Sequence, residues 1–166
     1  GGIGDVAWSP DGSMLATSIK NRSECILSLW DTTTGLELQR FNGEWEPTGG
    51  VSFSNRTTEH FSWSPDGRKI AIWSDRDFFN PPGPGGVWDV AEGNRLYDIG
   101  FSGGRDRKVI WSPDGTKLAA FCRLQPSSIL NSVDGTVLYT LSHPLDPDAG
   151  PSVLVWSPDD TKIAPG

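Results

Sequence analysis

Trp8-Ser9-Pro10-Asp11-Gly12 is the first copy of a motif that this chain of 166 residues contains four times. The later copies are Trp63-Ser64-Pro65-Asp66-Gly67, Trp111-Ser112-Pro113-Asp114-Gly115 and Trp156-Ser157-Pro158-Asp159-Asp160. The tryptophans of successive copies are 55, 48 and 45 residues apart, close to the period of a unit of four β-strands with insertions in its loops. Four copies exclude coincidence, so the chain is built from repeats.

Each copy of the motif predicts two strands joined by a tight turn. Proline presets the backbone for the first central position of a type I turn, aspartate suits the second, and glycine takes the left-handed position that follows. Asp160 replaces this glycine in the fourth copy, and aspartate enters the left-handed region more readily than most residues. Apolar runs follow the turns, as in residues 69–73 and 117–121. We expect these second strands to be buried on both faces.

Two further strands complete the first three units. The predicted third strands are residues 25–31, 86–89 and 128–134. Each ends in aspartate, and the turn after it is closed by Gly35, Gly93 or Gly135. The predicted fourth strands are residues 36–41, 95–99 and 136–141. The sequence therefore predicts three meanders of four strands and the initial hairpin of a fourth.

This pattern resembles the WD40 repeat family of β-propellers. Trp30-Asp31 and Trp88-Asp89 look like the Trp-Asp dipeptide of that family, and Ser132-Val133-Asp134 takes its place in the third unit. The family's Gly-His signature is missing from the chain, and TolB-like propellers, which also carry the Trp-Ser-Pro-Asp-Gly turn, are the alternative family.

The resemblance implies an all-β fold, a partial (open) β-propeller of four-stranded antiparallel blades. Residues 1–166 would form a single propeller segment. The expected blades are at about 4–41, 60–100 and 108–141, with half of a fourth blade at about 152–164.

Composition argues against several other classes of protein. The 20 glycines and 13 prolines make an all-helical fold unlikely. The formal charge of −7 disfavours nucleic acid and anionic lipid as partners, and the sequence has no apolar run long enough to span a membrane. We therefore expect neither a nucleic-acid nor a membrane partner.

Motifs that could support catalysis or metal binding are few. Gly100-Phe101-Ser102-Gly103-Gly104 matches the nucleophile elbow of hydrolases, but here a strand leads into a loop before another strand, whereas that motif needs a following helix. The two histidines and two cysteines do not have the spacing of a zinc site. Cys25 and Cys122 should lie a whole blade apart, too far for a disulfide, as reduced core residues. We therefore expect no catalytic residue, no metal, no cofactor and a cytoplasmic location.

The connections between strands predict a binding surface instead. In a propeller, the Ser-Pro-Asp-Gly turns and the Asp-to-Gly turns share one face, while the longer connections gather on the opposite face. These connections contain arginine and aromatic residues, which are enriched at interfaces. The candidate partner-binding residues are Arg22, Trp45, Arg76, Phe78, Phe79, Arg105, Arg107 and Arg123.

The resulting functional hypothesis is a non-enzymatic scaffold that binds a protein or peptide through this loop-rich face. Phe78 and Phe79, adjacent in a Pro/Gly loop, are its strongest feature, although they could instead pack over their own blade. The alternative is a TolB-like propeller segment that accompanies a hydrolase domain.

Two expectations concern packing. Seven of the eight tryptophans should lie in the core, with Trp45 as the exception. Closed propellers have about four to eight blades, so three and a half blades should leave an apolar flank at each end of the array. Further blades of a parent chain, or other copies of this chain, would cover these flanks.

Overall fold

The structure is a computed structural model, and it describes residues 2–20, 25–42, 59–74, 85–100, 105–123, 126–141 and 154–165. Within these ranges every regular element is a β-strand. None of the described residues forms a helix with the length and apolar character that crossing a membrane requires.

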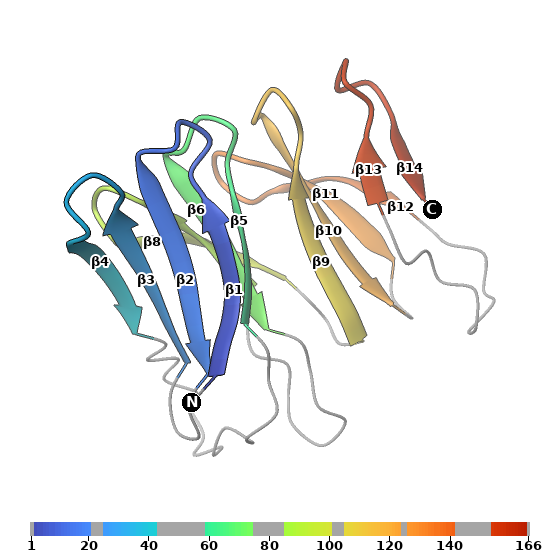
Figure 1. Cartoon of the computed structure of the whole chain (residues 1–166). Coiled ribbons are helices and arrows are strands. Elements are labelled where there is room, and N and C mark those ends of the chain that lie inside the picture. Colours follow the sequence, from blue (N-terminus) through green and yellow to red (C-terminus); the bar gives the residue numbers. More distant parts are fainter. Residues whose placement is uncertain are drawn as a thin grey trace.

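Three sheets of four strands and one hairpin make up the fold (Figure 1). The first sheet contains β1 (Gly2–Trp8), β2 (Met14–Lys20), β3 (Cys25–Asp31) and β4 (Glu37–Asn42). The second contains β5 (Glu59–Trp63), β6 (Lys69–Ser74), β7 (Gly85–Asp89) and β8 (Arg95–Ile99). The third contains β9 (Arg105–Trp111), β10 (Lys117–Arg123), β11 (Ser127–Asn131) and β12 (Val137–Leu141). The hairpin consists of β13 (Leu154–Trp156) and β14 (Ile163–Pro165).

Each sheet is an antiparallel meander in which consecutive strands pair with one another. We call the sheets blades 1, 2 and 3, and the hairpin the half blade. The blades stand side by side, with β1 next to β5 and β5 next to β9, and the array does not close on itself (Figure 1). The predicted fold class, an all-β, partial and open propeller-like array, is confirmed.

The Ser-Pro-Asp-Gly turns have the predicted backbone. Gly12, Gly67 and Gly115 have φ values of 73°, 70° and 71°, and Asp160 takes the same region with a φ of 58°. Among the described residues, Asp160 is the only non-glycine with positive φ. The prediction that aspartate replaces glycine in this conformation is therefore confirmed.

The third strand of blade 3 ends earlier than predicted. Strand β11 ends at Asn131, whose carbonyl oxygen accepts a hydrogen bond from the Gly135 N–H at 2.9 Å. Asp31 and Asp89 accept the corresponding bonds from Gly35 and Gly93.

Leu130-Asn131 is therefore the counterpart of the Trp-Asp dipeptide, and the assignment of Ser132-Val133-Asp134 to that place was wrong. The Asn131 side-chain oxygen accepts the Val133 N–H at 2.8 Å, as Asp31 accepts the Thr33 N–H at 2.9 Å. An amide oxygen can replace a carboxylate in this turn because both accept the same N–H.

The hydrophobic core lies between the blades. One cluster joins Ala16, Leu27, Leu29 and Phe41 of blade 1 to residues of blade 2 that include Ile70. A second cluster joins blade 2 to blade 3, and its buried members are Ala71, Trp73, Val87, Ile99, Val109, Trp111, Leu118, Ala120 and Leu130. Each blade is thus stabilised by the apolar faces of its neighbours.

The second strands show the effect of position in the array. Residues 70–73 of β6 and 118–122 of β10 are buried on both faces, as predicted. In contrast, Leu15 and Thr17 of β2 are half-buried and Ala164 of β14 is exposed. The prediction was wrong for these two strands because the end blades have a neighbour on one side only.

Candidate interaction surface

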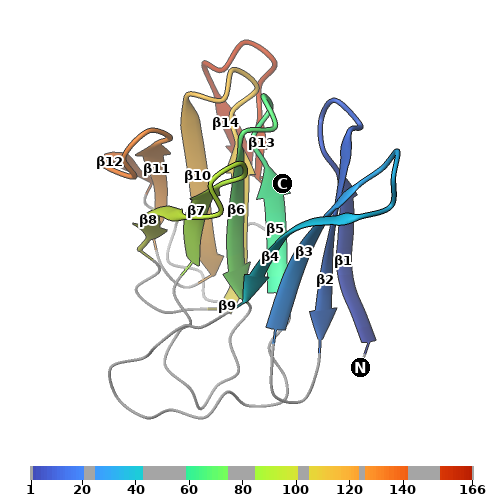
Figure 2. The same cartoon turned by 90° about the vertical axis from the view of Figure 1, so that its left-hand side faces the viewer.

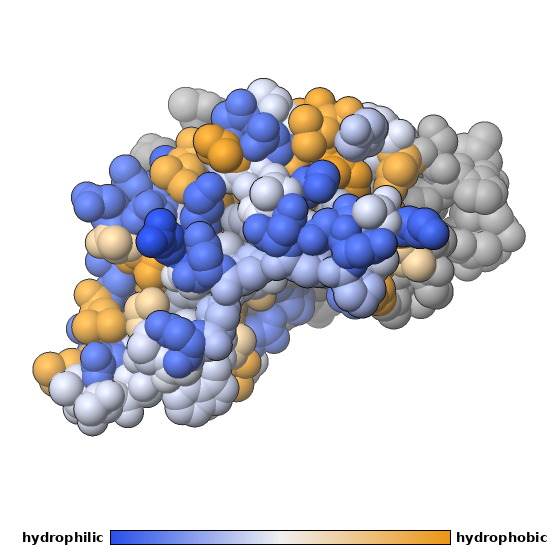
Figure 3. All heavy atoms as spheres, turned by 90° about the horizontal axis from the view of Figure 1, so that it is seen from above, coloured by the Kyte–Doolittle hydropathy of each residue, from blue (hydrophilic) through white to orange (hydrophobic). Residues whose placement is uncertain are grey.

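The loop face is the end of the strands opposite the short turns. Figures 1 and 2 show the turns that follow β1, β3, β5, β9 and β13 together at the other end, which we call the turn face. This arrangement agrees with the predicted separation of turns and long connections. Figure 3 looks onto the turn face, where hydrophilic residues run across the middle and hydrophobic residues form separate patches.

Five of the eight candidate partner-binding residues lie outside the described residues: Arg22, Trp45, Arg76, Phe78 and Phe79. Their role remains a prediction from the sequence. The other three candidates, which were expected in connecting loops, are in strands of blade 3.

Arg105 and Arg123 are brought together at the loop face. Arg105 is the first residue of β9, Arg123 is the last residue of β10, and the two are cross-strand partners beyond an irregularity at Phe121. The backbone register therefore places two residues of the same cationic type at one strand end, which suits a partner with an acidic group.

Arg107 does not belong to the predicted surface. Its side chain is 3% exposed within β9, and its backbone oxygen accepts a hydrogen bond from the Trp73 indole N–H at 2.9 Å. Arg107 therefore lies at the boundary between blades 2 and 3, and we remove it from the candidate residues. The correction follows from the length of β9, which begins at Arg105, so that Arg107 lies inside a strand and not in a connection.

The same pattern of hydrogen bonds stabilises each of the four Ser-Pro-Asp turns on the turn face. The serine hydroxyls of the motif donate to the aspartate carboxylates at 2.6 Å in Ser9–Asp11, Ser64–Asp66, Ser112–Asp114 and Ser157–Asp159. Each of these serine oxygens also accepts an N–H at 2.9 Å, from the first residue of the second strand in three copies and from Lys162, directly before β14, in the fourth. The turn and the start of the second strand are thus tied together.

These bonds stabilise the ionised carboxylates. The Ser9 hydroxyl, together with the Ser13 N–H and hydroxyl, lowers the pKa of Asp11 to about 2. The Ser112 hydroxyl and the Thr116 N–H and hydroxyl lower the pKa of Asp114 to about 2. The turn face therefore carries fixed negative charge at neutral pH.

Sequence reasoning missed a polar pair on the inner strands. His60 Nδ1 of β5 lies 2.7 Å from Asp5 Oδ2 of β1, and the His60 ring stacks on Trp73 with the ring centres 5.8 Å apart. Asp5 and His60 hold the same position three residues before the motif tryptophan, so the repeat alignment could have paired them. The pair links blade 1 to blade 2. Among the described residues, no group of three His, Cys, Asp or Glu side chains could hold a metal ion.

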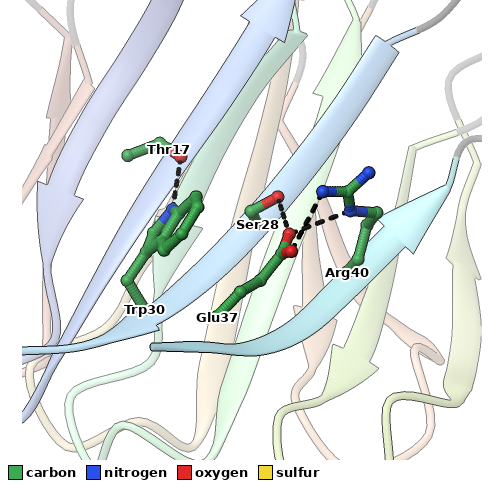
Figure 4. A network of polar contacts seen from close by, with 5 residues as sticks. All are labelled: Thr17, Ser28, Trp30, Glu37 and Arg40. Carbon is green, nitrogen blue, oxygen red and sulfur yellow. Dashed lines mark hydrogen bonds and ion pairs between the residues drawn. The ribbon is translucent and has the colours of Figure 1, made fainter. Parts of the chain in front are cut away.

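The outer strands of blade 1 carry a further network (Figure 4). Arg40 forms an ion pair with Glu37 at 2.9 Å, and Glu37 also accepts the Ser28 hydroxyl at 2.6 Å. These two contacts, with Arg40 the stronger, lower the pKa of Glu37. On the same face, the Trp30 indole N–H donates to Thr17 Oγ1 at 2.9 Å.

Blade 2 repeats this ion pair with the charges exchanged. Arg95 and Asp98 hold the positions of Glu37 and Arg40 relative to the turn glycine, and they form an ion pair. The Arg95 guanidinium also lies over the Trp88 ring, 5.3 Å from its centre. Both ion pairs lie on the outermost strand of their blade, and blade 3 has the uncharged Val137 and Thr140 at the same two positions.

Comparison of the whole sequence with known protein families and with curated proteins finds no match. The resemblance to WD40 repeats therefore rests on the motifs of this chain.

Proposed function

We propose that this chain is a non-enzymatic interaction module of the cytoplasm that binds a protein or peptide partner at its loop face. The observation that carries the proposal is the cross-strand pair Arg105 and Arg123 at the loop end of a buried hairpin. Arginine is enriched among residues that dominate binding energy, and the register places both arginines at one strand end.

The proposal has two further supports. The connections that leave the same end of the strands contain Trp45, Phe78 and Phe79, whose aromatic types are frequent at interfaces. The resemblance to WD40 propellers implies a scaffolding role. A partner segment with an acidic residue opposite the arginine pair fits this surface best.

Selection of peptides and matched arginine variants test the proposal. Peptides would be selected from a random displayed library on the 166-residue chain, and their dissociation constants measured by calorimetry for the wild type and for Arg105→Ala, Phe78→Ala and Arg68→Ala. Arg68 is the control, because it is an exposed arginine on the turn face. We expect Arg105→Ala and Phe78→Ala to weaken binding by about 1 to 3 kcal/mol and Arg68→Ala to have no effect.

The opposite pattern contradicts the proposal. Selected peptides that lose affinity with Arg68→Ala but bind Arg105→Ala and Phe78→Ala as tightly as the wild type would place binding on the turn face. Thermal unfolding of each variant checks that the fold is intact.

A further inference from the structure

The blades of this chain contact one another through a repeated tryptophan. The Trp63 indole N–H donates to the Ala7 oxygen at 3.4 Å, that of Trp111 to the Ser62 oxygen at 3.1 Å, and that of Trp156 to the Ile110 oxygen at 3.3 Å. In each case the acceptor is the residue directly before the tryptophan of the preceding blade. The same interface therefore occurs three times within one chain.

The turns take part in the same interface. A methyl group added at Gly67 would lie 3.6 Å from Cδ of Pro10, and one added at Gly115 would lie 3.5 Å from Cδ of Pro65. The turn glycines of blades 2 and 3 thus sit against the proline of the preceding blade. In the half blade, Asp160 takes the glycine position, and its carboxylate accepts the Asp114 N–H of blade 3 at 3.1 Å.

Blade 1 exposes the donor half of this interface. Trp8 is 62% exposed and Val6 is 59% exposed, while the equivalent Trp111 and Val109 of blade 3 are 8% and 1% exposed. A methyl group added at Gly12 would meet no atom within 4 Å. We call Val6, Trp8 and Gly12 the leading flank. The leading flank has the same residues as the interfaces between blades, but among the residues that the structure describes no other blade covers it.

The outer part of the same face of blade 1 is different in character. Its polar groups are already bonded within the blade, as the Trp30–Thr17 and Ser28–Glu37 contacts show (Figure 4). The exposed apolar side chains of the inner strand β1 on this face are Val6 and Trp8.

The half blade exposes the acceptor half. Val155 is the residue directly before Trp156, the position whose oxygen accepts in the other blades, and its side chain is 56% exposed. Pro158 holds the position of Pro10 and Pro65 and is also exposed. We call Val155 and Pro158 the trailing flank. Figure 1 shows the half blade, strands β13 and β14, at the opposite end of the array from blade 1.

We propose that the leading flank of one copy of this chain docks on the trailing flank of a second copy. The occupant is a second copy because one chain exposes both halves of an interface that it already makes three times internally. Trp8 donates its indole N–H to the Val155 oxygen of the next copy, and Pro158 of that copy packs on Gly12. Such contacts are heterologous, so copies associate head to tail. This inference goes beyond the proposed function, since it uses the blade flanks and not the loop face.

Association measurements with one variant on each flank test the proposal. Light scattering after size exclusion, over a range of concentrations, would be applied to the wild type, Trp8→Arg and Val155→Arg. We expect the wild type to associate, and each variant to associate about tenfold or more weakly, as for a central interface residue. Because Trp8→Arg keeps an intact trailing flank and Val155→Arg an intact leading flank, their equimolar mixture should form a one-to-one dimer.

Leu96→Arg is the matched control. Leu96 is 41% exposed although blade 2 has a neighbour on both sides, so it lies outside the blade interfaces. Its association should equal that of the wild type. A wild type that is monomeric at every concentration overturns the proposal. The two flanks would then be covered by another molecule or by further blades. A mixture of the two flank variants that forms no dimer, or a Leu96→Arg variant that is weakened equally, also overturns it.

Discussion

At the scale of single residues, the Ser-Pro-Asp-Gly motif explains the fold because each of its members satisfies a separate requirement of the turn. Proline and glycine set the backbone, while serine and aspartate bond the N–H groups that the turn leaves without strand partners. In the first copy, Asp11 accepts the Ser13 N–H at 3.0 Å and Ser9 accepts the Met14 N–H at 2.9 Å. The conformation of this turn can therefore be predicted from its sequence.

The aspartates of the turns predict that the stability of the fold decreases in acid. The pKa of Asp114 is about 2 in the folded chain, below the ordinary value of 3.8, so ionised Asp114 stabilises the fold above about pH 4 and loses this effect as the pH falls toward 2. Asp66 and Asp159 have lowered pKa values for the same reason, the hydroxyls of Ser64 and Ser157.

Asp114→Asn measures this effect. The amide keeps the acceptor oxygen but does not titrate, so the urea midpoint of the variant should fall less than that of the wild type between pH 4 and pH 2. Tryptophan fluorescence at a series of pH values gives both midpoints. Equal losses in the two proteins would show that the Ser112–Asp114 contact does not contribute to the acid sensitivity.

The tryptophans of the motif predict a contrast in stability. Trp111 is 8% exposed between blades 2 and 3, so Trp111→Ala should cost roughly 3 to 5 kcal/mol of unfolding free energy. Trp8 holds the same position and is 62% exposed, so Trp8→Ala in the monomer should cost less than about 1 kcal/mol. Denaturant unfolding of both variants makes the comparison, and equal losses would mean that blade 1 has a neighbour on its leading flank.

At the scale of elements, the order of strands within each blade could be predicted from sequence, and the packing between blades could not. Hairpins are local, so the turn residues and the alternation of the strands specify them. Trp8 was predicted in the core together with its three equivalents, but it is exposed. Burial of this position depends on a preceding blade, and a repeat motif carries no information on whether one is present.

The third strand of blade 3 shows a second limit. Asp134 was chosen because the other third strands end in aspartate, although the distance to the closing glycine assigns that place to Asn131. Asp134 instead accepts the N–H and hydroxyl of Thr136, and these bonds lower its pKa. The spacing to the closing glycine, which determines the hydrogen bonds of the turn, therefore identifies the equivalent residue better than its chemical type does.

The candidate site was less predictable than the fold. Arg105 and Arg123 are cross-strand partners because β9 and β10 extend toward the loop face, and the composition of a loop does not define where a strand ends. Arg107 was misplaced for the same reason.

The contribution of contacts between blades to stability can be measured at the turn that precedes the fourth strand of a blade. Gly135 and Gly35 both have positive φ, 74° and 71°, so alanine at either site pays a similar backbone cost of about 1 kcal/mol. A methyl group at Gly135 would overlap the Tyr97 ring of blade 2, whereas one at Gly35 would meet no atom within 4 Å.

Gly135→Ala should therefore destabilise the chain by about 1 to 3 kcal/mol more than Gly35→Ala. Chemical denaturation of the two variants gives this difference. Tyr97 is held there by a hydrogen bond from its hydroxyl to the Ser132 oxygen at 2.9 Å, and partial burial together with the nearby charge of Asp134 raises the pKa of Tyr97 to about 12. Equal destabilisation by the two alanines would contradict the packing of blade 3 on blade 2.

At the scale of the whole molecule, the structure is an array whose core lies between neighbours. Stability in such arrays is the sum of the stability of each repeat and of its interfaces. Blade 2, which is covered on both sides, should be the most stable part, and blade 1 and the half blade the least.

Exchange of the indole N–H protons tests this account most directly. In ¹⁵N-labelled protein at concentrations where the chain is monomeric, the indole N–H of Trp111 should exchange slowly, because it is buried and bonded to the Ser62 oxygen of blade 2. The indole N–H of Trp8 should exchange fast, because Trp8 is 62% exposed. Slow exchange at Trp8 equal to that at Trp111 would contradict an open array held together by contacts between its blades.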